Sequence, residues 1–579
     1  MTDITAKPFN LDERAATWVR DTLSKMSDEE KIGQLFCPQL ACFNREQVEY
    51  YTRVLKVGAV MLRPFEREGL KENIRAMQES CEIPLLVAAN LENGGNGVVT
   101  DGTLFANPMG CAATGDKING YRLGKIACGE AGEIGVNWAF APIVDIDRNY
   151  HNPITNVRTF GGNTDTVLAF AREYIRAAAE EKVVPTIKHF PGDGVDERDQ
   201  HLLVSVNDLS YDDWMRSFGK VYKTLIDDGT PTIMAGHIAA PNVAKAVGKE
   251  ISWQETLLPA SQSKTLLTDF LRGTLEFNGL VVTDSTLMVG YMQSMPRKRA
   301  VPYSVECGAD MILFNRSIEE DIAYMREGLK SGILSRARLD EAVTRILALK
   351  ASMGLYKKDF SVCESKERLF SETKEKWVCE CADKAVTLVK DNRKLLPLSP
   401  EKTKRIYLNV IENTADNRSP FASDIKARLA REGFKVTLRR RKYAFDPNAL
   451  TLEKITPAVD KALKEAMCNT EQFVSKYDLC LIVLNMQTAS NATVVRVNWN
   501  VLFGMGNDLP WYAGELPLVA VSVNNPYHLL DIPMAHAYIN AYTNNAATLD
   551  AVFEKLMGRS EFKGVSPVDA FCGKEDTRL

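Results

Sequence analysis

The stretch KHFPGDGVDERDQH, residues 188–201, concentrates side chains that can carry protons. It holds two of the six histidines of the chain, with three aspartates and a glutamate around a Pro-Gly turn. His201 follows Asp199 by two residues, and on a local turn a carboxylate at that spacing holds one imidazole nitrogen and favours the protonated ring. Because histidine changes its charge near neutral pH, we predict that Asp199 and His201 form a proton-transfer dyad. The alternative for His201 is an ordinary histidine in a surface loop.

A second candidate is Asp284 in the segment GLVVTDSTLMVG. It follows Leu280, Val281, Val282 and Thr283, so it emerges at the end of a predicted strand, where the backbone is rigid. A carboxylate held there can attack the anomeric carbon of a sugar and form a covalent intermediate while a second group protonates the leaving oxygen. Spacing alone leaves a helix N-cap as an equally good interpretation of Asp284.

Short apolar runs that alternate with longer amphipathic segments must position these residues. Patterns such as residues 164–181, with apolar side chains three and four apart, predict helices between the strands. Eight strands, each followed by a helix, are the count for a closed parallel (β/α)8 TIM barrel, although an open doubly wound sheet would alternate in the same way. The candidate strands are residues 33–40, 58–63, 83–90, 137–146, 183–190, 231–238, 279–285 and 309–315.

Polar residues at the C-terminal ends of these strands favour the barrel. In a barrel those ends converge on one face, where loops build the active site, while the strand interiors stay apolar. The residues at these ends are Asn90, Asp145, Lys188, His189, His237 and Asp284.

The pattern divides the chain into two α/β domains. We expect a catalytic barrel over residues 1–356, closed by a helix within 335–356, and a charged linker over 357–384. A smaller α/β sandwich domain follows over residues 385–579. Its predicted strands are residues 404–411, 477–485, 517–525 and 537–542.

Composition excludes several classes of partner. The 45% hydrophobic and 25% charged fractions are typical of globular proteins, and a net charge of −4 gives no reason to expect nucleic acid or an acidic membrane as partner. The first residues lack an apolar signal core and no run of 18 apolar residues occurs, so we expect a cytoplasmic protein. The twelve cysteines lack zinc-site spacing, and no GxGxxG opens a helix, so we expect neither a metal nor another cofactor. A homodimer stays open.

Several motifs resemble glycoside hydrolase family 3, in its β-N-acetylglucosaminidase branch. KHFPGDGVDERDQH resembles the loop signature K-H-F-P-G-x-G-x4-D-x-H, and VVTDSTLM resembles the nucleophile strand of the family. Residues 135–162 match a stretch G-x-N-x-x-F-A-P-x-x-D, followed by N-P and R-[ST]-F-G. AVTLVKDNRKLLPL (385–398) and GVSPV (564–568) resemble the opening and closing motifs of the α/β sandwich in the two-domain form.

The resemblance implies retaining, exo-acting hydrolysis of a terminal β-linked sugar. Asp284 would be the nucleophile and His201 the general acid/base, oriented by Asp199. Other branches of the family use a carboxylate from the second domain instead. Arg158, Lys188 and His189 match positions that bind sugar hydroxyls at the barrel mouth, and His237 is either a further binding residue or a packed structural histidine.

Four positions depart from the family pattern. Asn90, in NLENGG, stands where an acid usually grips a sugar hydroxyl, and Asn93 stands where glycine is usual. In the dyad loop Asp193 replaces the usual histidine, and DQH replaces DSH. The nucleophile and the dyad are intact, so activity is expected, but the identity of the sugar is open.

Four functions therefore compete. The first is a β-N-acetylhexosaminidase that removes terminal N-acetylglucosamine, with a small carbohydrate as substrate. The second is a phosphorylase with the same site, because a histidine acid/base, unlike a glutamate, does not repel an incoming phosphate. A β-glucosidase or β-xylosidase is third, although these enzymes usually lack the dyad loop. A binding protein on a catalytically dead barrel is fourth. A polar loop within 485–500 is a candidate for reaching the site.

Overall fold

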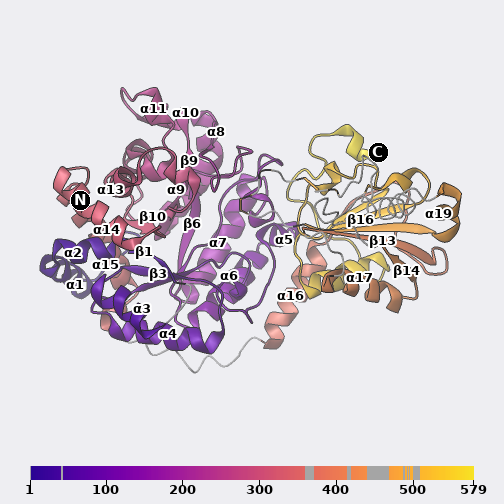
Figure 1. Cartoon of the computed structure of the whole chain (residues 1–579), viewed down its shortest axis with the longest axis horizontal. Coiled ribbons are helices and arrows are strands. Elements are labelled where there is room, and N and C mark those ends of the chain that lie inside the picture. Colours follow the sequence, from indigo (N-terminus) through magenta and orange to yellow (C-terminus); the bar gives the residue numbers. More distant parts are fainter. Residues whose placement is uncertain are drawn as a thin grey trace, which may run out of the picture. The chain divides into compact units, whose positions relative to one another are not determined.

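The computed structural model describes two compact units (Figure 1). The barrel unit comprises Met1–Ala112, Asp116–Trp377 and Ala489–Val494; the sandwich unit comprises Ala113–Gly115, Val378–Thr488 and Val495–Leu579. The described residues are 2–40, 44–358, 371–413, 419–439, 469–486, 490, 491, 493, 496, 497, 499 and 509–579.

The sheet of the barrel unit closes into a ring of eight parallel strand positions. Its order is β1-β11-β10-β8-β6-β5-β4-β3-β2. Pro38, which has no N–H group, separates β1 from β2, and these two pieces of one strand pair with β11 and β3 respectively. The predicted (β/α)8 barrel is therefore confirmed. Its strands are β1 (Phe36–Cys37), β2 (Gln39–Leu40), β3 (Ala59–Leu62), β4 (Leu86–Ala89), β5 (Trp138–Ala139), β6 (Val184–Phe190), β8 (Thr232–Ala235), β10 (Leu280–Ser285) and β11 (Met311–Leu313).

Side chains fill the interior of the barrel. The Trp138 indole donates to Thr232 Oγ1 at 3.2 Å, and the hydroxyls of Thr186 and Thr232 lie 2.7 Å apart. All three side chains are fully buried. The barrel thus has a packed core, so its chemistry has to lie at the ends of the strands.

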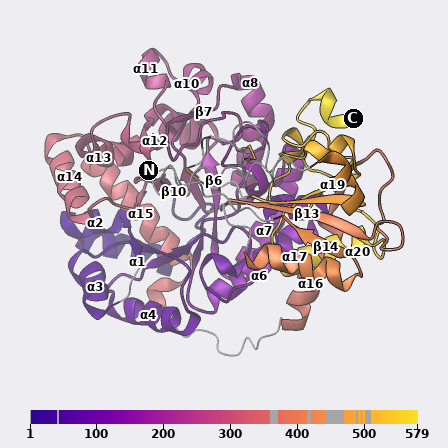
Figure 2. The same ribbon diagram turned by 45° about the vertical axis from the view of Figure 1, so that its right-hand side comes forward.

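Helices surround the barrel as the amphipathic patterns predicted. The pattern at 164–181 forms α7 (Thr164–Glu180), which begins where Asn163 accepts the free N–H groups of Asp165 and Thr166. The closing pattern at 335–356 forms α15 (Arg336–Ser352), and α15 lies beside α1 and α2 (Figures 1 and 2). The other long helices are α1 (Glu13–Lys25), α2 (Asp28–Gln34), α4 (Arg67–Ser80), α6 (Ile118–Gly132), α9 (Lys220–Asp228), α13 (Arg297–Cys307) and α14 (Ile318–Ser331).

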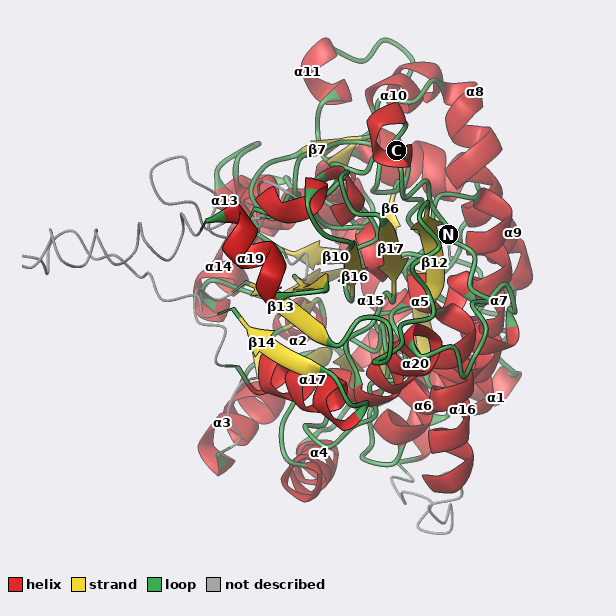
Figure 3. Ribbon diagram, turned by 90° about the vertical axis from the view of Figure 1, so that its right-hand side faces the viewer, coloured by secondary structure: helices red, strands yellow, loops and turns green. Residues whose placement is uncertain are grey.

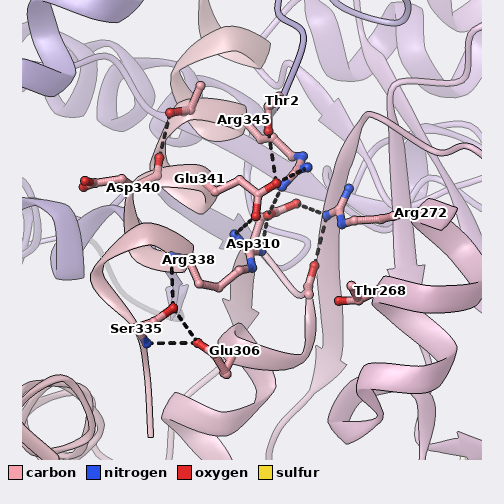
Figure 4. A network of polar contacts seen from close by, with 12 residues as sticks. Thr2, Thr268, Arg272, Glu306, Asp310, Ser335, Arg338, Asp340, Glu341 and Arg345 are labelled. Carbon is pink, nitrogen blue, oxygen red and sulfur yellow. Dashed lines mark hydrogen bonds and ion pairs between the residues drawn. The ribbon is translucent and has the colours of Figure 1, made fainter. Parts of the chain in front are cut away.

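A buried ion network ties strands to helices at the N-terminal ends of the barrel strands (Figure 4). Asp310, at the start of β11, accepts from Arg272 Nη2 at 2.7 Å, from Arg345 Nη1 at 3.3 Å and from Arg338. It also accepts the backbone N–H of Val281 at 2.8 Å. Burial raises the pKa of Asp310, but the three guanidinium groups outweigh this effect and hold it below its ordinary value. One carboxylate therefore joins β10 and β11 to two helical segments.

The sandwich unit is built on a six-stranded sheet of order β12-β17-β16-β15-β13-β14, in which only β12 runs antiparallel to its neighbour. Four strands confirm the predicted ones: β13 (Arg405–Glu412), β15 (Leu479–Asn485), β16 (Leu518–Ser522) and β17 (Ala537–Asn540). The edge strands are β12 (Thr387–Asp391) and β14 (Lys435–Leu438).

Each face of this sheet has its own core. In β15, Leu481 and Val483 face one core, while Ile482 and Leu484 face the other, as strand geometry requires. Helices α17 (Pro420–Arg431) and α20 (Ala546–Leu556) cover the first face, and α19 (Thr470–Lys476) covers the second (Figure 3). The predicted α/β sandwich is therefore confirmed.

The segment predicted as a linker, 357–384, contains most of a helix, α16 (Ser371–Ala385). The many charged residues of this helix obscure an apolar periodicity, so the sequence did not predict it. Residues 359–370 lie outside the described residues. The domain bounds themselves stay predictions. None of the helices in the described part of the chain combines the length and the apolar character needed to cross a bilayer.

The Asp310 network generates a test of stability. Asp310→Asn removes the charge that three buried arginines share, so we expect the free energy of unfolding of the barrel unit to fall by about 3–5 kcal/mol. Urea denaturation followed by tryptophan fluorescence measures the loss. Asp165→Asn breaks an ion pair with Lys220 in which both side chains are exposed, and should cost less than about 1 kcal/mol. Equal losses in both variants would contradict the role given to Asp310.

Candidate active site

His189 stands at the end of β6, between two carboxylates. Its Nδ1 lies 2.7 Å from Asp145 Oδ2, and its backbone N–H donates to Asp145 Oδ1 at 3.0 Å. Since the carboxylate accepts, Nδ1 carries the hydrogen, and Nε2 faces Asp284 Oδ2 at 3.8 Å. Both His189 and Asp145 are buried. The ends of β6 and β10 are thereby held in one site.

Asp284 lies at the end of β10, as predicted, with one oxygen accepting the Ser285 N–H at 2.7 Å. Burial raises the pKa of this carboxyl, but the imidazoles of His189, His237 and His201 outweigh it, and the pKa lies below its ordinary value. Asp284 is therefore an ionised carboxylate on a rigid strand end, as a nucleophile requires. It does not cap a helix, since the N-cap of the next helix, α12 (Val289–Met292), is Met288.

The predicted contact between Asp199 and His201 is formed. His201 Nδ1 lies 2.7 Å from Asp199 Oδ1, which also accepts the backbone N–H of His201 at 2.8 Å. Asp199 is fully buried, whereas 26% of the His201 side chain is exposed. Asp199 fixes the tautomer, so Nε2 is the nitrogen left to exchange a proton with a ligand.

The dyad loop is attached to the segment that follows Asp284. The backbone N–H of Val289 donates to the His201 carbonyl at 2.9 Å. The His201 ring is also one of the charges that lower the pKa of Asp284. The structure thus brings the two main candidates, found 83 positions apart in the sequence, into one site.

A third contact with the dyad comes from the polar segment 485–500. The backbone N–H of Asn491 donates to Asp199 Oδ2 at 2.6 Å. Residues Ala489–Val494 cluster with the barrel unit, although much of 485–500 lies outside the described residues. One point of this segment therefore reaches the site, and it satisfies the second oxygen of the dyad carboxylate.

Glu92 was not among the site residues predicted from the sequence. Its carboxylate forms two hydrogen bonds with Arg158, 2.9 and 2.8 Å long, and one of 2.7 Å with Lys188. Burial raises the pKa of Glu92, but the charges of Arg158 and Lys188 hold it well below its ordinary value. Glu92 thus orients both cations predicted to bind a sugar. Its position three residues beyond the end of β4, in NLENGG, was the available signal.

The last two predicted residues differ in their surroundings. His237 is fully buried, with Nε2 2.9 Å from the Ser285 carbonyl and Nδ1 2.9 Å from Ser261 Oγ. Its burial lowers its pKa, and because a carbonyl oxygen can only accept, Nε2 donates to Ser285. These contacts favour a packed histidine that supports the end of β10. Asn90 follows β4 and is half-buried beside the same face of the barrel.

Among the described residues, no group of three or more His, Cys, Asp or Glu side chains is arranged to hold a metal ion. The chemistry that the site can support with its own groups is nucleophilic attack by Asp284 coupled to proton transfer at His201 Nε2.

Comparison with known proteins identifies the family of the chain. The model of the glycosyl hydrolase family 3 N-terminal domain matches residues 27–349. A beta-N-acetylglucosaminidase/beta-glucosidase of Cellulomonas fimi is 40% identical over 588 residues, and the match covers 100% of both chains. The chain belongs to glycoside hydrolase family 3, which confirms the resemblance seen in its motifs.

Solved structures show the same two-domain architecture. The beta-glucoside phosphorylase BglX superposes with a TM-score of 0.89 at 43% identity, covering 99% of each chain. A family 3 beta-N-acetylglucosaminidase from Paenibacillus sp. superposes with a TM-score of 0.75 at 22% identity, covering 94% of this chain and 99% of that one. The second match shows the fold alone.

The Glu92 cluster generates a pH-dependent test. Because the pKa of Glu92 is lower in the folded chain than its ordinary value of 4.5, its stabilising effect is complete above pH 4.5 and is lost as the pH falls through the folded value. We expect Glu92→Gln to lower the free energy of unfolding by about 3–5 kcal/mol at pH 7, and by less below pH 4.5. Urea denaturation at several pH values measures this difference. The exposed Glu68→Gln is the control, and a difference that widens in acid would contradict the assignment.

Proposed function

We propose that the chain is a retaining, exo-acting β-glycosidase that cleaves a terminal β-linked N-acetylglucosamine or glucose residue through a covalent glycosyl–Asp284 intermediate. The observation that carries this proposal is the pairing of an ionised, strand-held Asp284 with the Asp199–His201 dyad in one site. The cytoplasmic location and the small-carbohydrate substrate expected from the sequence belong to the same proposal.

In the first step, Asp284 attacks the anomeric carbon while His201 Nε2–H protonates the leaving oxygen. The bond from carbon to the leaving oxygen breaks as the bond to Asp284 forms, so the anomeric configuration is inverted once. Asp199 keeps the hydrogen on Nδ1, so Nε2 alone carries the transferred proton. In the second step the neutral imidazole takes a proton from the incoming acceptor, which displaces Asp284 and restores the original configuration.

Lys188 and Arg158, the cations beside Asp284, bind the sugar. Lys188 gives one hydrogen bond to Glu92, which leaves two N–H donors of its ammonium group for hydroxyl oxygens. Arg158 is held by Glu92 from one side and by the Ile154 carbonyl from the other. Because Glu92 neutralises much of this charge, the pocket favours a neutral sugar over an acidic one. The names of both full-length relatives support glucoside or N-acetylglucosaminide substrates.

Phosphate is a second candidate for the acceptor in the second step. An imidazole base has no negative charge to repel a phosphate ion, whereas a glutamate would. The relative with 43% identity and full coverage is named a beta-glucoside phosphorylase. These two observations favour phosphorolysis as the particular alternative to hydrolysis.

The nucleophile is tested by Asp284→Asn. Removing the ionised oxygen should lower kcat/KM on nitrophenyl β-N-acetylglucosaminide and β-glucoside by at least about 10³-fold, because Asp284 is the attacking group of the covalent step. A 2-deoxy-2-fluoro-β-glycoside should label the wild-type chain once, and peptide mass spectrometry should place the label on Asp284. Asp165→Asn, on the exposed surface, is the control. Full turnover by Asp284→Asn would contradict the mechanism, and a wild-type chain without any turnover would favour the binding-protein alternative.

The acceptor is tested by product analysis. If phosphorolysis operates, adding inorganic phosphate should raise the rate and convert the sugar into its 1-phosphate, with the configuration retained after two inversions. NMR of the products in phosphate and in a phosphate-free buffer distinguishes the outcomes. Free sugar in both buffers, at equal rates, would leave hydrolysis as the activity.

A further inference from the structure

The two departures of the dyad loop from its family pattern contact each other. Asp193 and Gln200 are both buried, and Gln200 lies between the dyad residues Asp199 and His201. Gln200 Nε2 donates to Asp193 Oδ2 at 3.3 Å, and Gln200 Oε1 accepts the backbone N–H of His237 at 2.8 Å. The dyad is therefore attached, through the one residue between its members, to the start of its own loop and to the end of β8.

Asp193 is itself held from two sides. Its Oδ1 accepts Asn152 Nδ2 at 2.8 Å and the Gly194 N–H at 2.7 Å. Its own backbone N–H donates to Asp145 Oδ1 at 2.8 Å, and Asp145 also binds His189. The same carboxylate that orients His189 against the nucleophile thus anchors the residue that holds the dyad.

The polarity of this contact is fixed. His237 offers an N–H group, so the carbonyl end of Gln200 must face it, and the amide end must face Asp193. Asp193 then accepts from three N–H groups, as an ionised carboxylate does. Burial and the nearby Asp145 raise the pKa of Asp193 to about 7, so these donors are needed to keep it charged near neutral pH. The ionisable groups that interact with it are Asp145, His189 and Tyr222.

Two glycines allow the close packing of Gln200. A Cβ at Gly290, just after the nucleophile strand, would lie 2.4 Å from the Gln200 carbonyl oxygen. A Cβ at Gly236 would lie 3.1 Å from Gln200 Oε1 and 3.2 Å from the Cβ of His189. Gln200 is thus confined between β8 and the segment after β10, and a displaced Gln200 would displace His201.

We propose that Asp193 and Gln200 form a clamp that positions the dyad over the reacting bond, which makes both of them positioning residues for His201. This proposal rests on the proposed function, because it concerns the positioning of His201 as the acid/base. Neither residue reaches the reacting atoms; the clamp acts by fixing where His201 Nε2 lies. Loss of the contact would misplace the proton donor, and misplacement of a catalytic group by about 1 Å costs roughly 100-fold in rate.

The test is a reciprocal exchange of the two side chains. In Asp193→Asn, the introduced amide group faces the amide group of Gln200, and two donors oppose each other. In Gln200→Glu, two buried carboxylates face each other and need a shared proton, so activity should fall as the pH rises. In the double variant D193N/Q200E, the new amide donates to the new carboxylate, whose other oxygen still accepts the His237 N–H. The hydrogen bond is restored with its polarity reversed.

Leaving-group dependence separates positioning of the acid from general damage. Protonation matters for a poor leaving group but hardly for dinitrophenolate. We expect each single variant to lose about 10- to 100-fold in kcat/KM on a disaccharide and less than about 3-fold on the dinitrophenyl glycoside. The double variant should return to within about 5-fold of the wild type on both substrates.

Two further variants serve as an alternative and as a control. Gln200→Met removes both hydrogen bonds at equal length without burying a charge, so it serves if the single variants fail to fold. Gln78→Glu alters another buried glutamine, whose amide binds the backbone of Leu85, and should lower stability without changing kcat/KM. Circular dichroism and thermal melting check the fold of each variant.

The outcomes are distinct. If the wild type is active but the double variant recovers no kcat/KM, the clamp is overturned and the proposed function stands. The same holds if the single variants lose equal factors of kcat/KM on the disaccharide and on the dinitrophenyl glycoside. A wild type that turns over no glycoside overturns the proposed function, and the clamp falls with it. The expected result is that each single variant loses activity on the disaccharide and that the double variant regains it.

Discussion

The contact between Asp145 and His189 is the interaction on which the mouth of this barrel depends. A buried carboxylate needs several donors, and Asp145 finds three of them in one turn of chain: the ring and backbone of His189 and the backbone of Asp193. This satisfies Asp145, directs His189 Nε2 at Asp284 and fixes the start of the dyad loop. The geometry of Asp284 and that of the loop carrying Asp199 and His201 thus have a common origin.

The two ends of the barrel use buried charge differently. Around Asp310, three guanidinium groups compensate one carboxylate, and its two oxygens accept four N–H groups. Around Asp284, compensation comes from imidazoles, and one oxygen accepts the neighbouring backbone N–H. Arginine is charged at every physiological pH, whereas imidazole can release or take a proton. The first arrangement holds strands together, and the second leaves a carboxylate available to react.

Much of this architecture could be predicted from the sequence because it depends on local pattern. Apolar runs of a few residues gave all eight barrel strands and four of the six strands in the second sheet, and the strand-end rule placed Asp284 and His189 on one face. Asp199 and His201 are two positions apart, so their contact was also a local inference. The helix at 371–385 was not predicted because its sequence is dominated by charged residues and lacks a clear apolar stripe.

Contacts between distant positions could not be predicted in the same way. Glu92 lies 66 positions from Arg158 and 96 from Lys188, so only the fold reveals that one carboxylate serves both cations. His237 was ambiguous in the sequence because a strand-end histidine can face either a ligand or the protein. Its two ring nitrogens find Ser261 and Ser285, which are 24 and 48 positions away.

The departures at 193 and 200 show what a motif comparison misses when positions are read one at a time. Taken singly, Asp193 in place of histidine suggests a damaged site, and Gln200 in place of serine suggests a neutral change. In the fold they satisfy each other, and either change alone would leave a buried polar group unpaired, at a cost of about 1–3 kcal/mol. The two side chains are therefore compatible with burial only when both are present. The same coupling also ties the protonation of a buried carboxyl to the loop that carries Asp199 and His201, because Asp193 accepts from Gln200 through an oxygen that bears no proton.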